Sequence, residues 1–343
     1  MLHDLTHLHT LLADLPRGQL FVLTDSHTAE CCLPILADSI GQIPYHLLTL
    51  EAGEVTKNLT SVQLVWDFLL KHHATREAVL VNLGGGMITD LGGFAAATYM
   101  RGIRFVNIPT TLLAMVDASS GGKTGFDYQG IKNIIGTFTP PLTTLIYPEL
   151  LRTLPTIELL SGFAEMLKHG LIASPTHWQD LLAWDIHGQD IATLAPLIAD
   201  SIAIKQQIVS ADPHEKNIRR TLNFGHTIGH AIEAAYLQQG LQSYHGHCVL
   251  WGMVAEVYLS VVHAGCPREV LTMLSHIMVE HFGRPQCNCQ QQGLLLEWMR
   301  HDKKNHDADQ LNFTLLRCIG TPIIDQSLTD KDVNEALEYL FSL

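Results

Sequence analysis

The first part of the chain alternates short apolar runs, rich in β-branched residues, with stretches of helical periodicity. The apolar runs cover residues 20–24, 78–83 and 105–109. Strands that are apolar at every position are buried on both faces, as in a parallel sheet with helices on each side. The pattern therefore predicts an N-terminal α/β domain built on such a sheet.

The pattern changes after about residue 148, where long amphipathic helical stretches dominate. They cover residues 157–169, 178–184, 191–209 and 228–239, and the next strand pattern lies at 311–316. We expect Gly170 to cap the first helix, and Ser174 with Pro175 to begin the next. The predicted fold is α/β: a Rossmann-like parallel-sheet domain over residues 1–147, then a mainly α-helical domain over residues 148–343.

Composition narrows the function classes. The chain has 343 residues, of which 47% are apolar, enough for two well-packed domains. A net charge of −13 argues against nucleic acid or an anionic membrane as the main partner. A local basic pocket could still bind a small anion. Because no apolar run reaches membrane-spanning length and the start lacks a signal-peptide layout, we expect a cytoplasmic enzyme.

Cysteine and histidine usage adds little by itself. The odd count of seven cysteines predicts no disulfide framework and fits a reducing compartment. Cys287 and Cys289, with His281 nearby, could form half of a zinc knot, but the chain has no second pair at matching spacing. Since the chain has 20 histidines, no single one counts as evidence for a site.

Two glycine-rich turns point to anion binding. Gly84-Gly85-Gly86 follows a predicted strand directly, so backbone N–H groups and a helix N-terminus could meet a phosphate there. Its spacing is not that of the G-x-G-x-x-G fingerprint. The Gly-Gly-Lys-Thr turn ending at Thr124 also suits phosphate or carboxylate capture. It is not a Walker A motif, which would need glycine where Asp117 stands.

The second half contains a candidate metal site. Glu165 lies on a predicted helix, His226 and His230 share one helical face, and His245 follows nearby with His247. One carboxylate with two imidazoles is a common catalytic zinc set that leaves room for substrate oxygens. From spacing alone, His226 with His230 is the obvious chelating pair.

Basic residues recur beside these motifs although the chain has only 21 of them. Singly, each is an ordinary surface charge, but together they favour an anionic small substrate. They are Arg101, Lys123, Lys132, Lys168, Lys205, Arg219, Lys303 and Lys304.

Taken together, the motifs resemble those of the 3-dehydroquinate synthases, within the sugar phosphate cyclase superfamily, along nearly the whole chain and in the same order. The matches are G-E-x-x-K at 53–57, G-G-G-x-x-x-D at 84–90, P-T-T-L-L at 109–113, D-x-S-x-G-G-K-T at 117–124, K-N at 132–133, N-x-G-H-T-x-G-H at 223–230, H-G-x-x-V-x-x-G-M at 245–253 and D-K-K at 302–304. Leu154-Pro155, with Glu165 and Lys168 after it, also matches.

The resemblance implies a set of ligands for NAD and for a metal. NAD would be bound by Asp25, Gly53, Glu54, Lys57, Gly85, Gly86, Thr89, Asp90, Thr110, Thr111, Asp117, Lys123, Lys132, Leu150 and Thr153. Zinc, or cobalt in its place, would be bound by Glu165, His226 and His245. This replaces the pair suggested by spacing, because His230 would then face the substrate phosphate.

The resemblance also implies the substrate-binding and catalytic residues. They are Arg101, Asp117, Lys123, Lys132, Asn133, Lys168, Lys205, Glu215, Arg219, Asn223, His230, Lys303 and Lys304. Lys205 and Arg219 suit the carboxylate end of the substrate, and His230, Asn133, Asn223 and one lysine of the last pair suit its phosphate. Arg101 matches an arginine that reaches into a neighbouring subunit, which implies a homodimer.

The implied reaction belongs to the shikimate pathway and consumes 3-deoxy-D-arabino-heptulosonate 7-phosphate. NAD⁺ oxidises the C5 hydroxyl while zinc polarises the adjacent oxygens, and phosphate then leaves by β-elimination. NADH returns the hydride, the ring opens, and an aldol closure gives 3-dehydroquinate. NAD is therefore regenerated in each cycle.

Four positions depart from the family's pattern. Thr89 replaces a usual glycine, Tyr147 an aspartate, Asp127 an asparagine and His247 a glutamate. None of these is an implied zinc ligand. Thr89 lies in the loop expected to meet the pyrophosphate of NAD.

Three alternatives remain to be separated from this interpretation. A cyclase of the 2-deoxy-scyllo-inosose or valiolone type would not need Lys205 and Arg219 for a carboxylate. A polyol dehydrogenase of the glycerol dehydrogenase type would release NADH and would have no use for the lysine-rich pocket. A non-catalytic descendant is disfavoured by the intact set of Glu165, His226 and His245.

Overall fold

The protein is described by a computed structural model covering residues 5–119, 121–129, 131–188, 190–287, 291–300 and 311–343. It forms two compact units. Unit 1 comprises Met1–Pro155 and Asp190–Ala199, and unit 2 comprises Thr156–Gln189 and Asp200–Leu343. The domain boundary expected after residue 147 stays a prediction. Within the described residues, no helix is long and apolar enough to cross a membrane.

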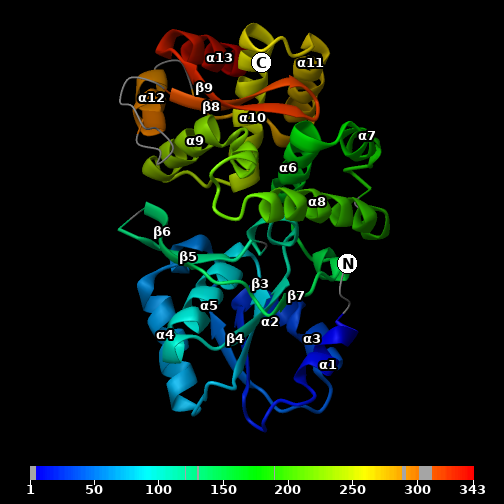
Figure 1. The fold of residues 1–343 in the computed structure, drawn as a ribbon, viewed down its shortest axis with the longest axis vertical. Coiled ribbons are helices and arrows are strands. Elements are labelled where there is room, and N and C mark those ends of the chain that lie inside the picture. Colours follow the sequence, from blue (N-terminus) through cyan, green and yellow to red (C-terminus); the bar gives the residue numbers. More distant parts are fainter. Residues whose placement is uncertain (1–4, 120, 130, 189, 288–290, 301–310) are drawn as a thin grey trace. The chain divides into compact units, whose positions relative to one another are not determined.

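Unit 1 is built on a parallel sheet (Figure 1). Its strand order is β2-β1-β3-β4-β7, with every neighbouring pair parallel. The strands are β1 (Leu20–Asp25), β2 (His46–Leu50), β3 (Val79–Gly84), β4 (Arg104–Pro109) and β7 (Thr143–Thr144). The three strands predicted from apolar runs are therefore confirmed. The half-exposed β2 and the two-residue β7 carry no continuous apolar run, so the pattern gave no sign of them.

Helices cover both faces of this sheet, as expected for strands buried on both sides. Figure 1 shows α4 (Leu59–Lys71) and α5 (Gly86–Thr98) on one face, with α1 (Thr6–Leu12) and α3 (Leu33–Ile40) on the other. Phe21, Leu80 and Phe105 pack in one buried cluster with side chains of α4 and α5. Burial of this cluster fixes the sheet and so fixes the loops that leave its strands.

The remaining elements of unit 1 are short and lie in the segments between or after the main strands. They are α2 (Ser26–Cys31), the 3-10 helices η1 (Glu54–Thr56), η2 (Tyr99–Arg101) and η4 (Pro148–Leu151), the π-helix η3 (Ala114–Ala118), and the antiparallel pair β5 (Lys123–Tyr128) and β6 (Ile131–Phe138). The hairpin begins within the Gly-Gly-Lys-Thr segment, at Lys123, and was not predicted.

Unit 2 is mainly helical, as expected. Its helices are α6 (Thr156–Ala173), α7 (Pro175–Ala183), α9 (His226–Gln238), α10 (His245–His263), α11 (Arg268–Ile277), α12 (Gln292–Arg300) and α13 (Asp330–Ser342), with η5 (Ile218–Asn223) and the π-helix η6 (Met278–Phe282). Helix α8 (Ile191–Ala211) has residues in both units. The antiparallel pair β8 (Leu311–Cys318) and β9 (Thr321–Leu328) completes the unit, and β9 was not predicted.

The junction between α6 and α7 corrects one expectation. Ser174 caps α7 by accepting a hydrogen bond from the His177 N–H at 3.1 Å, with Pro175 in the first turn, as predicted. Gly170, however, does not end α6, which continues to Ala173. A Cβ at Gly170 would lie 2.9 Å from the Cα of Trp178, so this glycine permits a close helix–helix approach instead of a cap.

Candidate active site

The residues expected to bind NAD gather at the carboxyl ends of the unit 1 strands. Asp25 ends β1, Gly53–Lys57 follow β2, Gly84 ends β3 and Thr110 follows β4. Strand β1 pairs with β2 on one side and with β3 on the other. The order in which successive strands join the sheet therefore reverses between β1 and β3, although all strands stay parallel. Open parallel sheets bind their ligands at such a switch point. The sheet topology therefore fits a nucleotide at this edge.

The triple glycine makes the turn from β3 into α5. A Cβ at Gly84 would lie 2.5 Å from that of Ile88, so any other residue would displace the helix from the strand. Gly85 is the N-cap residue of α5, and because glycine has no side chain, nothing on this residue covers the first N–H groups of the helix. The first turn of α5 thus presents its backbone N–H groups at the strand ends, as an anion requires.

Two of the expected NAD ligands form an ion pair within unit 1. Lys57 Nζ lies 2.7 Å from Asp90 Oδ2 and 3.7 Å from Glu54 Oε1. Burial alone would lower the pKa of Lys57, but the carboxylates of Asp90 and Glu54 hold it above its ordinary value. Burial also raises the pKa of Asp90. The G-E-x-x-K motif and the aspartate of the glycine motif are therefore one structural group.

Other expected NAD ligands differ in whether their side chains already make hydrogen bonds within unit 1. The Asp25 carboxylate caps α2 by accepting a hydrogen bond from the Thr28 N–H at 2.9 Å. Thr89 is buried and donates its hydroxyl to the Gly86 carbonyl at 3.2 Å, which is how the helix accommodates this departure from glycine. The Thr110 hydroxyl is buried and makes no hydrogen bond. A buried unpaired hydroxyl indicates a missing polar partner.

The rest of the predicted residues of unit 1 occupy loops and the hairpin. Asp117 lies in η3, Lys123 begins β5, Lys132 and Asn133 lie in β6, Arg101 ends η2, Gly53 precedes η1, Thr111 follows β4, Leu150 lies buried in η4, and Thr153 is exposed after it. Asn133 has a left-handed backbone, with φ 50°, and its N–H donates to Asp127 Oδ1 at 2.7 Å. Asp127, another departure, thus supports an unusual backbone conformation within β6.

In unit 2 the expected metal ligands come together. Glu165 lies in the middle of α6 and is fully buried, and His226 and His245 occupy the first positions of α9 and α10. Glu165 Oε1 lies 3.5 Å from His226 Nε2 and 3.6 Å from His245 Nε2. The other carboxylate oxygen of Glu165 pairs with Lys168, which is also buried.

These distances fit a shared metal ion. Zinc binds nitrogen and oxygen at about 2.0–2.2 Å, so two atoms on one ion lie no more than about 4.2 Å apart. Both nitrogen–oxygen distances fall below that limit, and the donors are one carboxylate and two imidazoles. His230 lies close as well, with its ring centroid 5.1 Å from that of His226. A nitrogen of His230 also lies within 4.8 Å of nitrogens of His226 and His245.

Glycine contacts explain why the ligands converge. A Cβ at Gly246 would lie 1.8 Å from the backbone oxygen of Ser161, so a larger residue here would push α10 away from α6. Gly225 has a left-handed φ of 79°, and its N–H donates to the buried Glu256 at 2.6 Å. Helices α9 and α10 therefore start beside Glu165, which gives the glycines of both histidine motifs a packing role.

Outer contacts orient both imidazoles. His226 Nδ1 lies 3.1 Å from the carbonyl oxygen of Phe224, and His245 Nδ1 lies 3.6 Å from Glu233 Oε2. Burial alone would lower the pKa of His245, but its hydrogen bonds to Glu165 and Glu233 raise it to about 10. No motif in the sequence pointed to Glu233. It lies seven residues after His226 on α9, so the helical period could have identified it.

His247, the departure that replaces a usual glutamate, lies in an apolar environment. Its ring centroid is 5.0 Å from that of Phe282 and 5.6 Å from that of Tyr244. Its Nδ1 is buried and makes no hydrogen bond. Burial lowers the pKa of His247 to about 4, so the ring is neutral at neutral pH.

The remaining predicted residues of unit 2 are largely built into the fold. Lys205 and Arg219 are buried although they are cations. Arg219 donates to the Pro213 carbonyl at 2.7 Å, and Asn223 Nδ2 donates to Glu215 Oε1 at 3.1 Å. Buried cations of this kind suit an anionic ligand. Lys303 and Lys304 lie outside the described residues.

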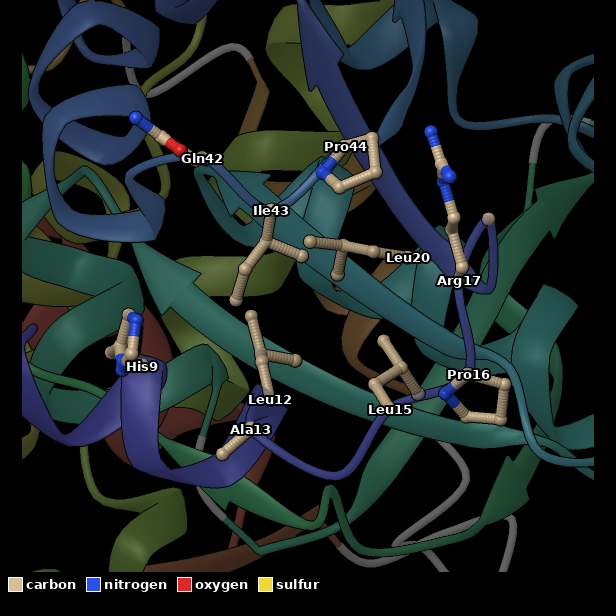
Figure 2. A pocket seen from close by; sticks show the side chains of 11 residues that line it. His9, Leu12, Ala13, Leu15, Pro16, Arg17, Leu20, Gln42, Ile43 and Pro44 are labelled. Atoms are coloured by element: carbon tan, nitrogen blue, oxygen red, sulfur yellow. The ribbon is translucent and has the colours of Figure 1, made fainter.

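One cavity lies away from all of these residues. It measures about 350 Å³ and is lined in unit 1 by side chains of α1, the loop before β1 and the segment before β2, including Leu12, Leu15 and Ile43 (Figure 2). None of the predicted site residues lines it. Its walls combine apolar side chains with those of His9, Arg17 and Gln42.

Comparisons with known proteins agree with the motifs. Residues 47–161 match the family model described as 3-dehydroquinate synthase N-terminal, and residues 162–305 match 3-dehydroquinate synthase C-terminal. A 3-dehydroquinate synthase from Parabacteroides distasonis is 43% identical over 334 residues, which are 97% of this chain and 94% of the relative.

Solved structures of similar fold include two cyclases. The 2-epi-5-epi-valiolone synthase from Streptomyces hygroscopicus, with NAD⁺ and Zn²⁺ bound, has a TM-score of 0.85 and 26% identity over 98% of this chain and 94% of its own. A 2-deoxy-scyllo-inosose synthase complexed with carbaglucose-6-phosphate, NAD⁺ and Co²⁺ has a TM-score of 0.84 and 23% identity over 98% and 95%. The expected α/β fold is confirmed.

Proposed function

The chain belongs to the 3-dehydroquinate synthase family, and from this premise we propose that it converts 3-deoxy-D-arabino-heptulosonate 7-phosphate into 3-dehydroquinate and inorganic phosphate. The reaction is a carbon–oxygen lyase reaction of the shikimate pathway with no net oxidation. The single observation that carries the proposal is the convergence of His226 and His245 on the buried carboxylate of Glu165. Such a set can hold a metal with positions open for substrate oxygens.

Two bound groups would supply chemistry that the side chains cannot. NAD⁺ supplies a recyclable hydride acceptor, and zinc, or cobalt in its place, supplies a Lewis acid for adjacent substrate oxygens. The donor atoms fit the metal, because both nitrogen–oxygen distances are below about 4.2 Å. The strand ends of unit 1 fit the nucleotide through the α5 N-terminus, the Lys57–Asp90 pair and the unpaired Thr110 hydroxyl.

Residues of unit 2 would hold the substrate for elimination. Arg219 and Lys205 are buried cations and would bind the carboxylate. His230, next to the metal ligands, would face the phosphate together with Asn223. Lys168 would stay paired with Glu165 and balance its charge. In this arrangement, positioning and charge neutralisation lower the barrier to phosphate loss.

From the resemblance we propose roles for further residues of unit 1 and for the pair Lys303 and Lys304, one of which would contact the phosphate. Asp117, Lys123, Lys132 and Asn133 would bind substrate, NAD or both, and Glu215 of unit 2 would position Asn223. We also propose a homodimer, in which Arg101 reaches the neighbouring subunit's site. Arg101 is exposed, so its side chain is available to another chain.

The test follows phosphate and NADH together. The chain is supplied with the heptulosonate phosphate, zinc and NAD⁺ at about one-tenth of the substrate concentration. We expect phosphate in stoichiometric yield with no net NADH, because the hydride returns to the substrate in each cycle. Net NADH without phosphate would identify a dehydrogenase. Phosphate from a sugar phosphate without a carboxylate, and none from this substrate, would identify another cyclase.

Arg219→Ala separates those cyclases further. Losing a charged hydrogen bond of about 1.5–3 kcal/mol should lower kcat/KM for the carboxylate substrate at least about tenfold. Arg220→Ala is the matched control, because that neighbour pairs with Asp325 instead. An unchanged kcat/KM in Arg219→Ala would remove the carboxylate role from this residue.

A further inference from the structure

A second group of metal-binding side chains lies in unit 2, away from Glu165. It joins His187, in the loop after α7, to Glu280 and His281 in the π-helix η6. One potential ligand atom from each residue lies within 4.8 Å of one from each of the others. None of the three belongs to a motif of the family, and nothing in the proposed reaction uses them.

The local backbone brings these side chains to one place. Helix α11 ends at Ile277 and continues directly as the π-helix η6. Short π segments are rare and often mark functional sites. The loop after α7 then places the His187 ring beside that of His281, with 5.1 Å between their centroids.

The donor atoms are suited to a divalent transition metal. His281 Nε2 lies 3.8 Å from Glu280 Oε2, within the roughly 4.2 Å that two ligands of one ion allow. His276 Nδ1 lies 3.1 Å from the same carboxylate oxygen, so a further imidazole is close enough to contribute a ligand. Imidazole nitrogens with one carboxylate suit zinc, copper and nickel better than calcium or magnesium.

His281 is the most preorganised member of the group. Its side chain is only 14% exposed, and its Nδ1 is buried without a hydrogen-bond partner. His187 and Glu280 are exposed, so their side chains can rotate the remaining distance at little cost.

We propose that His187, Glu280 and His281 form a second binding site for a zinc-like divalent metal, distinct from the site at Glu165. The ion would tie the loop after α7 to the end of α11. A cavity of about 150 Å³ is lined by two of the three residues, His187 and His281, and by Phe163 and Trp184. The site therefore has an apolar wall on the side of this cavity. On its other side the exposed ligands His187 and Glu280 face solvent.

The experiment counts ions per chain by equilibrium dialysis against micromolar zinc, followed by elemental analysis. We expect two zinc ions per wild-type chain and one in His187→Ala. The affinity for the second ion should fall at least about tenfold, since losing even an outer partner of a metal ligand costs that much. His187 is exposed, so the variant should fold normally. His263→Ala, on α10, is the matched control and should retain two ions.

The variants separate this proposal from the main metal site. His226→Ala should lose the other ion and keep the one at His187, and combining it with His187→Ala should leave none. The proposal is overturned if the wild-type chain binds a single ion. It is also overturned if His187→Ala and His281→Ala both keep the second ion at unchanged affinity. Loss of one ion in His226→Ala, with both ions kept in His187→Ala and in His281→Ala, would likewise overturn it.

Discussion

In unit 2 the side chains expected to hold a metal come from three helices and meet around one buried carboxylate. In unit 1 the residues expected to hold NAD come from the ends of neighbouring strands, and several already serve the fold itself. Glu165 has both imidazole nitrogens within 3.6 Å, whereas Asp25 caps a helix and Lys57 pairs with Asp90. A metal needs ligands fixed to a few tenths of an ångström, while a dinucleotide can be bound largely by backbone groups.

The comparison predicts that unit 1 depends on its ion pair for stability as well as for binding. Lys57→Met would leave Asp90 without its partner in a largely buried position, which should lower the free energy of unfolding by about 4 kcal/mol. Urea unfolding measures this. Lys71→Met, at the exposed end of α4, should change stability by less than about 0.5 kcal/mol.

A double variant sharpens that prediction. Combining Lys57→Met with Asp90→Asn removes both charges, so it should recover at least half of the lost stability. If the single and double variants are equally unstable, the cost arises from packing of the lysine chain and not from an unpaired carboxylate.

The stability and zinc affinity of unit 2 should depend on the close backbone packing at Gly246. Gly246→Ala would place a methyl group 1.8 Å from the Ser161 carbonyl oxygen and force α10 away from α6. We expect a loss of about 3 kcal/mol in stability and weaker zinc binding, because His245 would move from Glu165. Gly293→Ala is the control, since its Cβ would meet nothing within 4 Å. Equal stability in both variants would contradict the packing argument.

The aromatic environment of His247 predicts a smaller, pH-dependent effect. Burial holds the pKa of His247 at about 4 in the folded chain, against about 6.5 when unfolded. Between these values the unfolded chain binds more protons, so folding stability falls as the pH drops. From pH 7 to 5, with a chelator present, the wild-type chain should lose about 2 kcal/mol more than His247→Gln. The same pH dependence in both chains would show that this ring does not titrate as described.

Much of the fold followed from the hydrophobic pattern. Strands β1, β3 and β4 are buried at nearly every position, so their sequences contain the apolar runs that predicted strands. Helices α6 to α9 carry long amphipathic repeats, which predicted helices. Strand β2 alternates buried and exposed positions over only five residues, and β9 is half-exposed, so neither stood out. Gly170 misled because a glycine near a helix end is compatible with a cap and with a close helix contact.

The site was only partly predictable. Spacing on α9 identified His226 and His230 as a pair, but the sequence alone could not place Glu165, 61 positions earlier by residue number, beside His226. That contact depends on glycines that let α6, α9 and α10 touch, which is a property of packing. The resemblance to a family supplied the grouping that periodicity could not, and the distances to Glu165 are consistent with it.

The central claim is that Glu165, His226 and His245 form one metal centre, and zinc affinity at that centre tests it most directly. Competition with a chelating indicator should be measured for His187→Ala, in which the site at Glu165 stands alone, and for the same chain carrying His226→Ala or His263→Ala. We expect His226→Ala to weaken zinc binding about 100-fold or more, with secondary structure unchanged, and His263→Ala to leave it unaltered. Equal zinc affinity in all three chains would contradict the assignment of this centre.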